Sequence, residues 1–126
     1  MLETTAVSMT IVVALSDTQT GRGYLGHFTP DSPDLNDMIE KALRQANHPY
    51  HINVWYGGAA FVPPPQRGGG NPNGEIRMFR IKVSRLLATK GFRVRDQKWL
   101  RQGESMIVRL LAGSEHCAFA SLPPRG

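Results

Sequence analysis

Cysteine is nearly absent from this sequence, and no long run of apolar residues occurs in it. The single cysteine, Cys117, excludes an intramolecular disulfide, which is typical of proteins in a reducing compartment. No segment approaches the roughly 20 apolar residues that a membrane-spanning helix needs. The N-terminus has no basic segment ahead of a long apolar core, so a secretory signal is not expected. These absences predict a cytoplasmic protein that does not enter the membrane.

Common motifs for metals and nucleotides are also missing. The four histidines have no cysteine or carboxylate at the spacing of a zinc site. There is no Walker loop, and the glycines at 68–70 lie in a proline-rich stretch instead of between a strand and a helix. The sequence therefore predicts no metal and no cofactor.

The composition that remains is that of one ordinary globular domain. The 126 residues are 40% hydrophobic and 20% charged, enough apolar material for a single core, so residues 1–126 are expected to form one domain. The net charge is +5, and eleven of the fifteen basic residues lie between Arg67 and Arg109. Such a field attracts an acidic protein surface or a nucleic acid, although a solvated basic face has the same composition.

Hydrophobic periodicity predicts a mixture of strands and helices with no internal repeat. The expected order is a strand at 4–15, a hairpin strand at 22–28, a helix at 33–46, a strand at 51–56, a helix at 75–90, and short strands near 92–94, 106–111 and 117–120. The first strand is apolar on both faces and should be buried on both sides. We expect an α+β fold, a layered sandwich of mixed or antiparallel β-sheet with two main helices.

Two connecting segments have distinctive compositions. Gly57 to Ala60 are all small, so neighbouring backbones can approach them closely. The Pro/Gly-rich segment 63–74 offers little apolar surface to anchor it, and we expect a poorly ordered or functional loop there.

Both expected helices are amphipathic. In the first, capped by Asp31 or Ser32, one face carries an apolar stripe: Leu35, Met38, Ile39, Ala42, Leu43 and Ala46. In the second, which should stop at Gly91, the core-facing residues are expected to be Ile76, Phe79, Val83, Leu86 and Leu87. Its three arginines, Arg77, Arg80 and Arg85, should face outward and are the candidate binding residues for a nucleic acid.

Two residues are candidates for thiol or imidazole chemistry. Cys117 follows His116, but neighbours in a strand point to opposite faces, so these two side chains should not meet. Cys117 is expected to be a small buried hydrophobe. His27 lies at the end of the hairpin strand, ahead of a proline-containing loop. A lone histidine is more often structural than catalytic, so its neighbours decide its role.

The order of several segments resembles the chemoreceptor glutamine deamidase (CheD) family. The resemblance rests on VVALSD, GYLGHFTPDS, the helix at 33–46, INVWYGGAAF and MIVRLLAG, and it covers about residues 4–113. It implies a fold of β-sheets packed between helix layers and a Cys–His–Thr site. In that chemistry a thiolate attacks the side-chain amide of a receptor glutamine, ammonia leaves, and water releases glutamate.

Carried over to this chain, the resemblance implies a site without its nucleophile. The histidine falls on His27 and the threonine on Thr4, but the position of the cysteine holds Thr10. Two family positions near the start of the second helix, a glycine and an asparagine, fall on Ile76 and Phe79, and a family arginine falls on Glu104. The changes concentrate at the implied site, as in a fold retained after activity is lost.

Three functions are compatible with these observations. The first is a catalytically impaired deamidase homologue that acts by binding a protein; the resemblance implies chemoreceptor helices or a chemotaxis phosphatase as partners. The second is an active amidohydrolase that uses Thr10, His27 and Thr4. The third is a nucleic-acid-binding domain that uses the basic helix at 75–90.

Overall fold

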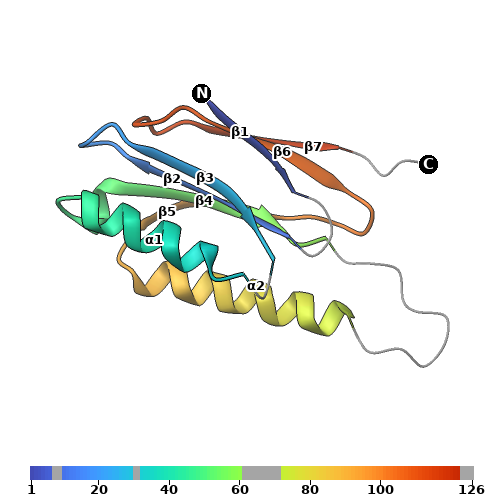
Figure 1. The fold of residues 1–126 in the computed structure, drawn as a ribbon. Coiled ribbons are helices and arrows are strands. Elements are labelled where there is room, and N and C mark those ends of the chain that lie inside the picture. Colours follow the sequence, from blue (N-terminus) through green and yellow to red (C-terminus); the bar gives the residue numbers. More distant parts are fainter. Residues whose placement is uncertain (7–9, 30–31, 61–71, 123–126) are drawn as a thin grey trace, which may run out of the picture.

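The computed structural model describes residues 1–6, 10–29, 32–60 and 72–122 of the chain (Figure 1). Two helices, a short 3₁₀ helix and seven strands follow one another as β1 (Leu2–Ala6), β2 (Ile11–Asp17), β3 (Gly23–Phe28), α1 (Asp34–Gln45), η1 (Pro49–His51), β4 (Ile52–Gly58), α2 (Pro72–Thr89), β5 (Arg93–Trp99), β6 (Ser105–Leu110) and β7 (Cys117–Leu122). No helix in these described ranges is both long and apolar enough to cross a bilayer.

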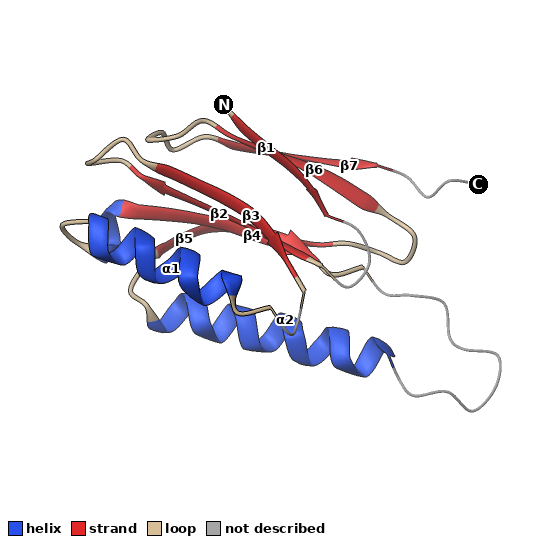
Figure 2. Ribbon diagram, in the orientation of Figure 1, coloured by secondary structure: helices blue, strands red, loops and turns tan. Residues whose placement is uncertain are grey.

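The described elements form three layers. One sheet has the strand order β3-β2-β4-β5 and the other the order β1-β6-β7. Both helices cover one face of the four-stranded sheet, and the three-stranded sheet covers its other face (Figure 2). All pairings are antiparallel except that of β4 with β5, which is parallel. The expected α+β layered sandwich is confirmed.

The central strand β2 explains why its sequence is apolar on both faces. Ile11, Val13 and Leu15 pack in the core under the helices. Val12 and Ala14 pack in a second core between the two sheets. All seven residues of β2 are therefore buried, because each face meets a different layer.

The prediction of a single strand over 4–15 is wrong. That segment contributes β1 to the three-stranded sheet, where Thr4 pairs with Val108, and β2 to the four-stranded sheet. Both strands are extended and rich in β-branched residues, and period-2 alternation carries no information about which sheet a strand joins. Residues 7–9 lie outside the described ranges.

The helices agree closely with their predicted ranges. Leu35, Ile39 and Ala42 of α1 are buried, and the Ser32 hydroxyl accepts a hydrogen bond from the Asp34 backbone N–H at 3.2 Å. The N-cap position is nevertheless Pro33, which has no side-chain cap hydrogen bond, so Ser32 is not the cap, and Asp31, the other proposed cap, lies outside the described residues. Helix α2 begins at Pro72 instead of residue 75, so the end of the expected loop is helical and the rest of it falls outside the described ranges. Gly91, at φ +81°, follows the end of α2 as expected.

The small residues at the end of β4 do allow a close backbone approach. A Cβ atom placed on Gly57 would lie 2.1 Å from the carbonyl oxygen of Lys98 in β5. Only glycine fits there, because real Cβ atoms essentially never approach an oxygen so closely. Beyond it, the backbone N–H of Leu100 donates to the carbonyl of Gly58 at 3.0 Å.

Candidate functional site

A threonine and a histidine from different sheets meet in a hydrogen bond. Thr4 is on β1, at one edge of the three-stranded sheet, and His27 is on β3, at one edge of the four-stranded sheet. The Thr4 Oγ1 atom lies 3.0 Å from the His27 Nδ1 atom. His27 is exposed and Thr4 is half-buried, so the pair lies at the rim of the space between the sheets.

Strand register explains why both side chains point into that space. His27 pairs with Val12, and Thr4 pairs with Val108; both valines are fully buried in the core between the two sheets. Directly paired residues in a sheet project from the same face. The sequence resemblance had implied both residues, which are 23 positions apart along the chain.

Thr10 lies next to this pair. Its carbonyl accepts a hydrogen bond of 2.7 Å from the Ala59 backbone N–H, so it extends the pairing of β2 with β4 by one residue. Thr10 lies one residue before β2 and two before Val12, the direct partner of His27. The strands β2 and β3 are adjacent and antiparallel, as expected, and a shared face for the side chains of Thr10 and His27 stays a prediction.

Arg80 supports the backbone at Ala59, next to Thr10. The prediction that Arg80 faces outward is wrong. Its guanidinium donates to the Ala59 carbonyl at 2.6 and 3.2 Å and to the Leu100 carbonyl at 3.0 Å. It also lies over the Trp99 ring, 5.1 Å from its centre. Burial, followed by the positive charge of Arg77, lowers the pKa of Arg80 below its usual value.

The spacing of Arg80 could have indicated its orientation. Arg80 is four residues after Ile76 and three before Val83, so it falls inside the apolar stripe of α2. A long side chain in that stripe reaches past the core to carbonyl groups at the ends of β4 and β5. Ala59 has a φ of +48°, unusual for a residue with a side chain, and Arg80 holds its carbonyl in this conformation.

The other candidate residues lie on the surface of α2, in the core or in a turn. Arg77 and Arg85 are exposed, as expected for the outer face of α2. Ile76 and Phe79 are buried in the core under the helices. The carboxylate of Glu104 accepts a hydrogen bond of 2.6 Å from the Arg101 backbone N–H within a turn.

Cys117 lacks the surroundings of a nucleophile. It is half-buried in β7 and packs against the core between the sheets. Burial raises the pKa of its thiol from 9.0 to about 11. The expected small buried hydrophobe is therefore only partly buried. In the described parts of the chain, no group of three or more His, Cys, Asp and Glu side chains is arranged to hold a metal ion.

We expect the Cys117 thiol to react slowly with iodoacetamide at neutral pH, because only the thiolate is nucleophilic. The rate should rise with pH toward a midpoint of about 11, the pKa that burial imposes. Stopped-flow or mass-spectrometric alkylation from pH 6 upward measures this profile, with the denatured chain as the reference. A native midpoint at or below that of the denatured chain would contradict the account of its surroundings.

Comparison of the sequence with models of known protein families and with curated proteins found no match. The resemblance to the glutamine deamidases therefore stays a hypothesis about this chain, and the hydrogen bond between Thr4 and His27 is the observation that bears on it.

Proposed function

We propose that the protein is a deamidase-like domain that has lost thiol chemistry and acts by binding another protein. The observation that carries this proposal is the hydrogen bond between Thr4 and His27, which joins the edge strands of two sheets. These are the two of the three implied site residues whose type is retained. Thr10 stands at the third position, one residue before the start of β2.

The hydrogen bond engages Nδ1 of His27 and leaves Nε2 as the second ring nitrogen. Where the Nδ1–H donates to the Thr4 hydroxyl, Nε2 carries the lone pair; where the hydroxyl donates to Nδ1, Nε2 carries the proton. We propose that Nε2 faces the group at position 10. A thiol at this position would be ionised by an adjacent imidazolium. A threonine hydroxyl is far less acidic than a thiol, so the same histidine does not generate a comparable nucleophile from Thr10.

The remaining groups suit recognition of an amide without its hydrolysis. The exposed ring of His27 can donate or accept a hydrogen bond, as a glutamine side-chain amide requires of its partner. Loss of the nucleophile from a catalytic triad costs roughly a millionfold in turnover. We therefore propose that the site binds glutamine-bearing protein segments, and the resemblance points to chemoreceptor helices or a chemotaxis phosphatase.

We expect no enzymatic ammonia release from purified chemoreceptor cytoplasmic fragments. The measurement is a coupled glutamate dehydrogenase assay, with His27→Ala as the matched control, and both proteins should give the blank rate. Ammonia release that His27→Ala abolishes would instead establish the alternative, an amidohydrolase using Thr10, His27 and Thr4. Calorimetry should detect binding of the same fragments to the wild-type protein, and this binding should be weaker in His27→Ala.

The nucleic-acid alternative loses one of its three candidate residues. Arg80 is engaged with Ala59 and Leu100, so only Arg77 and Arg85 of that set are presented on the outer face of α2. Phosphate contacts make nucleic-acid binding steeply salt-dependent, so titration with random DNA at two salt concentrations tests this function separately.

A further inference from the structure

The outer layer of the protein contains a pocket between α1 and α2. Its volume is about 300 Å³, and it is open to solvent on one side. Its apolar floor is formed by Leu35, Phe79, Val83 and Leu86, and two basic side chains, Lys82 and Arg85, stand at its rim. The remaining lining residues are polar and uncharged, and no acidic residue is among the described residues that line it.

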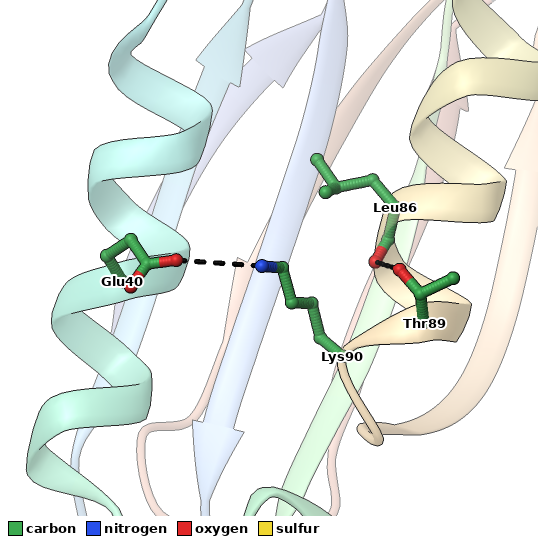
Figure 3. Close-up of polar contacts among 4 residues, drawn as sticks. All are labelled: Glu40, Leu86, Thr89 and Lys90. Carbon is green, nitrogen blue, oxygen red and sulfur yellow. Dashed lines mark hydrogen bonds and ion pairs between the residues drawn. The ribbon is translucent and has the colours of Figure 1, made fainter.

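Two polar contacts involve or adjoin the lining residues Leu86 and Thr89. The Lys90 ammonium and the Glu40 carboxylate form an ion pair at 3.6 Å that spans the two helices (Figure 3). The Thr89 hydroxyl donates to the Leu86 carbonyl of its own helix at 2.9 Å (Figure 3). The ion pair offsets the charge of Glu40, and the two charged residues that line the pocket, Lys82 and Arg85, are both basic.

Exposed apolar side chains continue the surface beyond the pocket. Met78 is 66% exposed and Ile81 is 45% exposed, both high values for large apolar residues. With Lys82 and Arg85 they occupy positions i, i+3, i+4 and i+7, which is one face of a helix. Apolar residues interleaved with basic ones, beside an apolar pocket, are typical of a protein-binding surface.

We propose that this α1–α2 groove binds an acidic amphipathic helix of a partner protein. One apolar side chain of the partner would enter the pocket, others would cover Met78 and Ile81, and its carboxylates would pair with Lys82 and Arg85. A pocket this open cannot enclose most of a small ligand, but a helix lying along α2 would cover both the pocket and the apolar residues beside it. Single-stranded nucleic acid is disfavoured because it prefers aromatic stacking surfaces, and the exposed apolar residues here are Met78 and Ile81.

The two helices that line the groove cover one face of the four-stranded sheet (Figure 2), whereas Val12, the direct partner of His27, packs in the core on the other face of that sheet. The inference therefore does not rest on the function proposed for that pair. Variants of the groove and of His27 should affect separate binding events.

The test uses the full chain and two labelled synthetic peptides of about 20 residues, long enough to form helix. Both carry leucines at i, i+3, i+4 and i+7, and they differ only in having flanking glutamates or flanking glutamines. We expect fluorescence anisotropy to show at least about tenfold tighter binding of the glutamate peptide. Lys82→Glu combined with Arg85→Glu should weaken that binding at least about tenfold, and Met78→Ser should weaken it severalfold.

The matched control is Arg93→Glu combined with Arg95→Glu, which makes the same change of net charge on the exposed strand β5. This control should retain binding within about threefold. Equal losses in both double variants, or equal binding of both peptides, would mean general attraction to a basic protein and would overturn the proposal. It would also be overturned by groove-dependent binding of a single-stranded DNA oligonucleotide in place of the peptide, or by self-association that the groove variant abolishes in sedimentation equilibrium.

Discussion

Replacement of Gly57 by alanine should cost about 3 kcal/mol or more of unfolding free energy. The added Cβ would lie 2.1 Å from the Lys98 carbonyl oxygen and 2.9 Å from the carbonyl carbon, and both are backbone atoms that cannot rotate away. Relief requires β5 to separate from β4, with loss of their parallel pairing. For a domain of this size we expect the melting temperature to fall by roughly 10 °C or more, measured by circular dichroism.

Gly21→Ala is the control for glycine substitution as such. Gly21 has a φ of +79°, and no heavy atom lies within 4 Å of an added Cβ, so the variant bears only the left-handed backbone cost of about 1–2 kcal/mol. A loss for Gly57→Ala no larger than that for Gly21→Ala would contradict the close approach of β4 and β5.

Much of this fold follows from local patterns along the chain. The apolar stripe of α1 and the two-sided burial of β2 reflect periods of 3.6 and 2 residues, which depend on neighbouring residues only. The run of small residues that includes Gly57 also predicted a close backbone contact without identifying Lys98 as the group contacted. Local sequence patterns therefore predicted the helices, most of the strands and the close backbone approach at Gly57.

Long-range placement could not be predicted in the same way. The assignment of β1 and β2 to different sheets depends on the pairing of Thr4 with Val108, more than 100 residues away. The orientation of Arg80 depends on carbonyl groups at the ends of β4 and β5, which no helical pattern contains. The groove between α1 and α2 likewise arises only when the two helices pack on one sheet.

The candidate site was implied by resemblance and not by periodicity. The residues alone offered His27 as a lone histidine at a strand end, and spacing gave no reason to connect it with Thr4. The hydrogen bond between them crosses from one sheet to the other, so its partners could be paired only by a known arrangement or by the structure. Because this bond engages His27, the chemistry of the site depends on which residue stands at position 10.

Thr10→Cys should produce a thiol whose pKa is well below the free value of about 8.5. Cysteine and threonine are similar in size, so the backbone that pairs Thr10 with Ala59 should accept the change at low cost. An imidazolium beside the thiol stabilises the thiolate, and Thr4 orients that ring through Nδ1. A pKa lower by two units raises the thiolate fraction below both values about a hundredfold, with a large gain in alkylation rate near pH 6.

Reactivity need not restore deamidation. Ile76, Phe79 and Glu104 stand where the resemblance implies other residues, and here they belong to the core and to a turn. We therefore expect a fast-reacting thiol in Thr10→Cys without release of ammonia from chemoreceptor fragments. Turnover in this variant would mean that the departures at these three positions do not limit the chemistry.

The most direct test of the proposed site is the pH profile of iodoacetamide alkylation of Thr10→Cys in a Cys117→Ala background. We expect a midpoint well below 8.5, and a return to about that free value when His27→Ala is added. A midpoint at or above the free value, unchanged by His27→Ala, would show that His27 does not act on position 10 and that the Thr4–His27 hydrogen bond is structural only.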